Sequence, residues 1–174
     1  DNFSRRILAW MIAERFHPAI TAQLLLDASK SMTSGQPMVL VDGGVENFNS
    51  AVDEVIESGL LKRVLAQTEI TFSNSLIESW WRVLKHQWLY LNTLDTVATV
   101  RKLVAFYVEQ HNNHLPHSAF RGQTPDEMYF GTGADIPQQL EAAHIAARAS
   151  RLKANREQRC QLCTESEKLV SLSR

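Results

Sequence analysis

The chain has 174 residues, of which 44% are hydrophobic and 21% are charged, as in ordinary globular proteins. Its formal net charge of −1 argues against a protein that coats nucleic acid through bulk positive charge, but it is compatible with a local basic face. No apolar run approaches the roughly 18 residues of a membrane span. We therefore expect a cytoplasmic protein that does not act at a membrane.

Both ends of the chain are informative. The first residue is Asp1 rather than Met, and the basic pair Arg5-Arg6 precedes apolar residues without the cleavage site of a signal peptide, so we interpret the chain as a fragment. Cys160 and Cys163 form one isolated C-x-x-C pair, whereas a zinc site needs about four ligands. We expect two ordinary cysteines in a reducing compartment.

The first half of the chain predicts strands that alternate with helices. The apolar run 38–41 (MVLV) is typical of a strand that is buried on both faces. Pro18 suits the first position of a helix, and Gly59 suits the end of another. The expected elements, in chain order, are a strand over 3–13, a helix over 18–31, a strand over 38–41, a helix over 50–58 and a strand over 61–66.

The second half predicts mainly helices. A polar loop over 68–74 precedes two long helical patterns, and the Thr124-Pro125-Asp126-Glu127 sequence resembles a capping box that begins a further helix. The expected helices cover 75–91, 94–111 and an exposed tail from about residue 136. The pattern predicts an α/β fold with a mixed sheet flanked by helices, divided into a core over 1–133 and a helical extension over 134–174.

Asp42 is the first candidate functional residue. It ends a predicted strand, at the edge where ligands bind in open α/β sheets, and Gly43 and Gly44 would permit a sharp turn and the close approach of a substrate. Asp-Gly-Gly is also a common plain turn, and by itself this motif leaves both interpretations open.

Glu78 is the second candidate. It opens a predicted helix in which Arg82 and Lys85 follow at offsets of 4 and 7, so the three side chains share one face. Such a face could hold a metal ion at one end and phosphates along the rest. Two structural alternatives remain: Glu78 could cap its helix with Ser75, or pair with Arg82 as an ordinary i,i+4 ion pair.

Asp42 and Glu78 have 35 residues between them, and this arrangement resembles the integrase and insertion-sequence transposase family. Five local sequences agree in order with motifs of that family: Asp1–Trp10, Asp42–Phe48, Phe72–Ser79, His111–Ala119 and Gln123–Tyr129. Among the departures, Gly43 stands where the family usually has Asn, and Leu115 stands where it usually has Arg. The resemblance covers roughly residues 1–130.

The resemblance implies a ribonuclease H-like fold and metal-dependent cleavage and strand transfer of DNA in transposition. Asp42 and Glu78 would be two of three catalytic acids that hold Mg²⁺ or Mn²⁺, which prefer carboxylate oxygens. Arg82 and Lys85 would bind DNA phosphates. The partners implied are DNA, at the element ends and at the target, and further copies of the chain.

The family's first catalytic Asp lies on a strand that would precede residue 1. We therefore expect a core truncated at its N-terminal strand and an inactive fragment. A degenerate, non-catalytic ribonuclease H-like module that binds DNA or a partner is the alternative, and a structure-selective nuclease also stays open. The remaining possible carboxylates are Asp27, Glu46, Asp53 and Glu54.

Three further groups favour structural interpretations. His111, His114 and His117 cross a helix end and a Pro turn, which would scatter their rings. Tryptophans on the Glu78 helix suit an apolar stripe with Ile77 and Leu84. The tail has several cations, but Glu157, Glu165 and Glu167 dilute them, which favours a solvated helix over a DNA contact; the cations are Arg148, Arg151, Lys153, Arg156 and Arg159.

Overall fold

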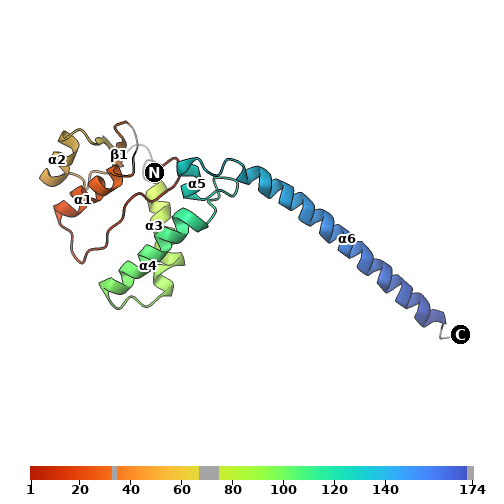
Figure 1. Ribbon diagram of the computed structural model, residues 1–174. Helices are drawn as coiled ribbons and strands as arrows, with labels where there is room; N and C mark the ends of the chain where they lie inside the picture. Colours follow the sequence, from red (N-terminus) through yellow and green to blue (C-terminus); the bar gives the residue numbers. More distant parts are fainter. Residues whose placement is uncertain (33–34, 67–74, 172–174) are drawn as a thin grey trace.

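The computed structural model describes residues 1–32, 35–66 and 75–171, with side chains through residue 158. A head formed by two strands and two helices lies beside a pair of longer helices, and one very long helix projects away from both (Figure 1). The predicted loop over 68–74 lies outside the described residues. The α/β class predicted from the sequence is confirmed.

The sheet of the described residues has two parallel strands. β1 (Met38–Val41) pairs with β2 (Lys62–Leu65), with Met38 opposite Lys62 and Val41 opposite Leu65. Both predicted strands are confirmed, but the described sheet is parallel rather than mixed. The predicted burial of β1 on both faces is wrong, since Met38 is 72% exposed. Helices cover the Val39 side of the sheet, and no described layer covers the other side.

Two helices form the covered side of this head. α1 (Pro18–Ser29) and α2 (Ser50–Glu57) pack against each other and against β1. Each helix begins at a capped end: His17 Nδ1 accepts from the Ala19 N–H, and the Asn49 side chain accepts from the Val52 N–H. Their core consists of four buried residues, Ala22, Val52, Val55 and Leu61.

Aromatic side chains hold the pair of longer helices together. α3 (Ser75–Gln87) leads through the short 3₁₀ turn η1 (Leu89–Leu91) to α4 (Val97–Glu109), which continues into the π-helical turn η2 (Gln110–His114). The Trp88 indole N–H donates to the Leu103 carbonyl at 2.9 Å, and its ring stacks on Phe106 at 5.3 Å. The predicted apolar stripe is confirmed for the buried Leu84 but not for Ile77 and Trp81, which are exposed.

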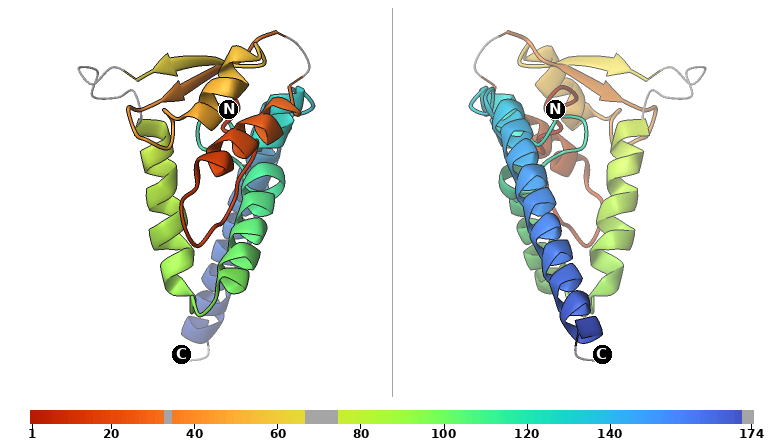
Figure 2. Two further views of the ribbon diagram at one scale, coloured as in Figure 1. Left: turned by 90° about the vertical axis from the view of Figure 1, so that its left-hand side faces the viewer. Right: turned by 90° about the vertical axis from the view of Figure 1, so that its right-hand side faces the viewer.

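Residues 3–13 do not form the predicted strand. This segment is irregular and loops down from the head alongside the pair of long helices before it reaches α1 (Figure 2). Its backbone is bound by side chains instead of by a neighbouring strand: the Asn112 amide both accepts from the Ile7 N–H and donates to the Ile7 carbonyl, each at 3.0 Å. A β-branched and aromatic sequence becomes a strand only where another strand supplies its ladder, and no described strand lies beside this one.

The chain ends in a short helix and a long one. α5 (Pro125–Phe130) begins with the predicted capping box of Thr124 and Glu127, and it ends at Gly131 with φ +70°. α6 (Ile136–Ser171) then projects from the rest of the chain (Figure 1). Described side chains from Gln138 to Gln158 are exposed, as predicted for the tail. No helix of the described residues is long and apolar enough to cross a membrane.

Candidate active site

Asp42 directly follows β1 and is exposed. Its Oδ1 accepts from the Gly44 N–H at 3.1 Å and from the Asn47 amide at 2.8 Å. These bonds orient one oxygen and leave Oδ2 without a described protein partner, although the same bonds also suit a plain Asx turn. Gly43 and Gly44 do not adopt positive φ, so the backbone conformation of this turn does not require glycine.

Asn47 is a residue of this site that the sequence analysis did not single out. It donates to Asp42 across the turn, while its carbonyl accepts from the Arg63 guanidinium at 2.9 Å. Arg63 therefore ties the turn to β2. The only signal in the sequence is the five-residue interval between Asp42 and Asn47, which by itself is too common to indicate a contact.

Glu78, Arg82 and Lys85 all lie on α3 and are exposed. Within the described residues, no ion pair joins Glu78 to Arg82, so the i,i+4 pair is not formed. The Lys85 ammonium lies 5.7 Å from the centre of the Trp81 ring. Glu78 stands in the first turn of its helix, where the helix dipole favours a carboxylate, and the two cations follow on the same side.

The sheet and α3 are arranged around one edge. Both strands end at the same edge of the sheet, and α3 begins beneath that edge (Figure 2). The fold thus brings the elements of Asp42 and Glu78 to one end of the molecule. The proximity of the two carboxylates themselves stays a prediction. Among the described residues there is no group of three or more His, Cys, Asp or Glu side chains that could hold a metal ion.

Two of the other carboxylates that the sequence offered form ion pairs with Lys or Arg side chains. Asp27 pairs with Lys30 at 2.6 Å, and this hydrogen bond holds the pKa of Asp27 below its ordinary value. Asp53 pairs with Arg63 at 2.7 Å, so both have structural partners. Glu46 and Glu54 are exposed, and no described ion pair engages them.

Two of the three spaced histidines make hydrogen bonds within the described part of the chain, which agrees with the predicted structural roles. His111 Nε2 donates to the Arg5 carbonyl at 2.8 Å, because a carbonyl can only accept. His117 Nδ1 accepts from the Ala119 N–H at 3.2 Å. Burial, followed by the charges of His111 and Arg5, lowers the pKa of His117. His114 is exposed and lies 3.9 Å from Glu109.

Comparison with known proteins supports the resemblance seen in the sequence. Residues 64–125 match the family described as Integrase core domain. The resemblance to integrase and transposase catalytic cores is confirmed. The matched segment contains Glu78, Arg82 and Lys85, whereas Asp42 precedes it.

One curated relative extends the likeness. The chain is 20% identical over 128 residues to a protein named as the transposase InsK for insertion sequence element IS150 of Escherichia coli strain K12. The aligned part is 73% of this chain and 45% of that protein, so the chain spans about half the length of the relative it matches.

Proposed function

We propose that this chain forms part of the catalytic core of a transposase that cleaves DNA strands and joins them to a target with the help of a divalent metal. The observation that supports this proposal best is the Integrase core domain match, because it contains the helix of Glu78. The name of the relative, a transposase of an insertion sequence, agrees with it. The proposal includes a ribonuclease H-like core over 1–133, an extension over 134–174, and assembly with further copies of the chain.

Asp42 and Glu78 have the donor chemistry that Mg²⁺ or Mn²⁺ requires. Both carboxylates are exposed, and Asp42 Oδ2 has no described protein partner. A pair of carboxylates is compatible with Mg²⁺, which keeps several of its waters. When bound, the metal would activate the attacking oxygen and stabilise the leaving oxygen of a phosphodiester.

The chain's own residues would position the DNA. Asn47 and the Gly44 N–H hold Asp42 Oδ1, so Oδ2 would be the oxygen offered to a metal. Arg82 and Lys85 would bind phosphate oxygens of the strand whose scissile bond lies at Glu78, because they occupy the same face of α3. Their exposure and freedom from described ion pairs leave both charges available for that contact.

The proposed activity needs a third carboxylate, which the resemblance assigns to a strand that precedes the Asp1–Trp10 sequence. The test therefore uses a protein that extends this chain N-terminally by such a strand, with labelled DNA that ends in the element's own sequence. Cleavage and strand transfer that require Mg²⁺ or Mn²⁺, and that disappear in Asp42→Asn and in Glu78→Gln, are the expected result. Glu54→Gln, which removes an exposed carboxylate from α2, is the matched control. Equal activity in all three variants would contradict the assignment.

A further inference from the structure

The charged residues in the middle of α6 are all positive. Between Glu141 and Glu157 the helix contains no acidic residue, yet this stretch has four cations: Arg148, Arg151, Lys153 and Arg156. The whole chain has a net charge of −1, so this stretch of positive charge is local. The acidic residues that favoured a solvated helix over a DNA contact all follow this stretch; they are Glu157, Glu165 and Glu167.

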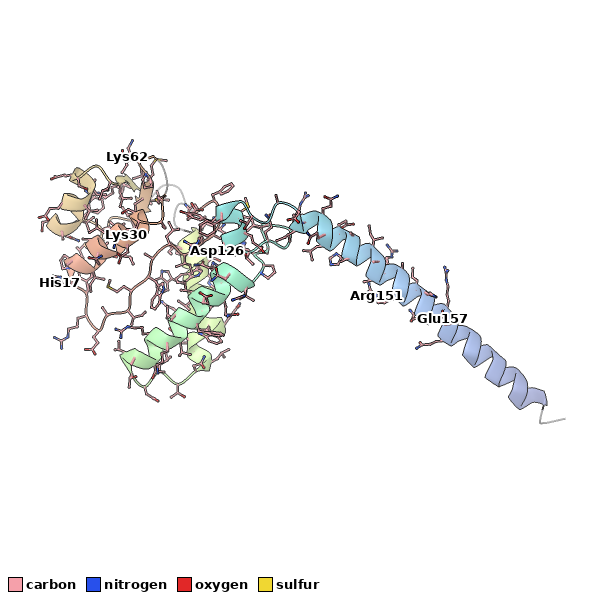
Figure 3. All side chains as sticks on the ribbon, viewed as in Figure 1. His17, Lys30, Lys62, Asp126, Arg151 and Glu157 are labelled. Carbon is pink, nitrogen blue, oxygen red and sulfur yellow. The ribbon has the colours of Figure 1, made fainter. Side chains whose placement is uncertain are left out.

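Tertiary packing does not explain these cations. The described contacts of α6 with the body lie at its first turns, where Ile136 and Leu140 flank Gly122. Arg151 and Glu157 project from the part of the helix that extends away from the other elements (Figure 3). An exposed side chain with no neighbour to pack against adds little to the stability of the fold.

Neutralisation within the helix is also incomplete. Lys153 lies 4.0 Å from Glu157, and both side chains are exposed. Among the described side chains, Arg148, Arg151 and Arg156 form no ion pair. Three guanidinium groups therefore remain in water with their charge and their donors available.

The spacing of these groups forms a usable surface. His144, Arg148 and Arg151 are separated by four and three residues, which places them on one face of the helix. Arg148 and Arg156 are about 12 Å apart along the axis at the helical rise. Duplex DNA presents a negative charge about every 1.7 Å of its axis, so such a face can meet several phosphates at once.

We propose that the segment 144–156 of α6 is a second nucleic-acid contact, which binds the phosphate backbone of duplex DNA without reading its sequence. The proposal rests on the proposed function only in taking DNA as the partner. The contact is separate from Arg82 and Lys85, which belong to α3. Its chemistry is charge-assisted hydrogen bonding between guanidinium groups and phosphate oxygens.

An anionic membrane surface fits this segment less well. A helix that lies in the membrane interface needs an apolar face, usually with Trp, Phe and Leu. The stretch from Ala142 to Arg156 contains no Phe, Trp or Tyr, and its large aliphatic side chains are Ile145 and Leu152. Alanine occupies much of the remaining surface and offers little apolar area for insertion.

The experiment compares two variants of the full chain that lose the same charge. Arg148→Gln with Arg151→Gln removes two cations from α6, and Lys62→Gln with Lys102→Gln removes two exposed cations from β2 and α4. Binding of a labelled duplex is measured by fluorescence anisotropy across a salt series, with a chelator present so that no divalent metal contributes. Gln and Arg have similar helix propensities, so both variants should keep the helicity of the parent chain by circular dichroism.

We expect the α6 variant to bind roughly tenfold more weakly at low salt, and the slope of log affinity against log salt to fall by about 0.9 for each lost phosphate contact. The control variant should keep the parent slope. Arg148→Lys with Arg151→Lys should keep most of the affinity of the parent chain, because the positive charge supplies most of the binding to phosphate.

Three results would overturn the inference: equal losses in the two Gln variants, no loss in the α6 variant, or a loss of binding to phosphatidylserine vesicles with DNA binding unchanged. The first would indicate a net-charge effect, the second a DNA path elsewhere, and the third a membrane contact. Metal-dependent cleavage by the extended protein is measured separately, so a failure of this inference leaves the test of the proposed function intact.

Discussion

The Asn112 side chain makes two reciprocal hydrogen bonds with the backbone of Ile7, one to its N–H and one to its carbonyl, and each is 3.0 Å long. A single buried amide therefore supplies to the N-terminal segment the donor and acceptor that a neighbouring strand would provide. The two residues are 105 positions apart in the sequence. This contact, with His111 on the Arg5 carbonyl, fixes the segment to the end of α4.

Asn112→Ala should lower the free energy of unfolding by about 2 kcal/mol or more, because it leaves two backbone groups of Ile7 without partners. Urea denaturation followed by circular dichroism measures this change. Asn113→Ala is the matched control: Asn113 is exposed and bonds to Glu109, so its loss should cost about 0.5 kcal/mol or less. Equal effects of the two substitutions would show that the Ile7 contact does not stabilise the fold.

Gly122→Ala should loosen the base of α6. Gly122 has φ +100°, and a Cβ added there would lie 2.1 Å from Leu140 Cδ1, so backbone strain and a steric clash combine. Gly131 has φ +70° and open space around it. Gly131→Ala therefore adds only backbone strain, of about 1 kcal/mol, without a steric clash. We expect Gly122→Ala to destabilise more than Gly131→Ala, and Leu140→Ala to relieve part of the difference in a double variant. The midpoint of thermal unfolding is measured for Gly122→Ala, Gly131→Ala, Leu140→Ala and the Gly122→Ala, Leu140→Ala double variant. A smaller loss of stability in Gly122→Ala than in Gly131→Ala would contradict the packing of Leu140 against Gly122.

Stability should decrease in mild acid because of His117. Its pKa is lowered in the folded chain, so the unfolded chain binds more protons in the window just below the ordinary value of 6.5. The contribution of this group is complete above that value and falls as the pH falls through the window. His117→Asn keeps an acceptor for the Ala119 N–H without a titrating ring, and it should flatten the dependence between about pH 7.5 and 5.5. His144→Asn, which removes an exposed imidazole from α6, is the matched control.

Arg82→Gln with Lys85→Gln should weaken binding of duplex DNA and reduce the salt slope by up to about 0.9 per lost phosphate contact. Their shared face with Glu78 on α3 is the reason for this expectation. The Lys62→Gln with Lys102→Gln variant serves as the control for net charge. An unchanged affinity and slope in the α3 variant would place the DNA on another surface.

The 174-residue chain by itself should not nick DNA in the presence of Mg²⁺ or Mn²⁺. Two-metal catalysis needs carboxylates on both ions, and the resemblance assigns to this chain only Asp42 and Glu78 of the three catalytic acids. A nicking assay with supercoiled plasmid measures this directly. Robust activity that is lost in Asp42→Ala would mean that another acid of this chain completes the site.

The sequence by itself indicated most of the local elements and the resemblance to integrase and transposase cores. Helix ends could be located from local signals, namely Pro18, Gly59 and the capping box of Thr124. Each of these signals acts on backbone groups only a few residues away. The short apolar run 38–41 likewise indicated a strand. The spacing of Asp42 and Glu78 and the five ordered motifs indicated an integrase-type core, because such motifs persist in the sequence whatever the packing around them.

Only the tertiary structure decided which segments found partners. Residues 3–13 have strand-like composition, yet they remain irregular because Asn112, far along the chain, takes the place of a neighbouring strand. Met38 is exposed although its strand has the composition of a buried one, since no described layer covers that face. Trp81 likewise lies at the surface beside Lys85. Strand pairing and burial depend on neighbours that are distant in the sequence, and a local pattern contains no information on whether those neighbours are present.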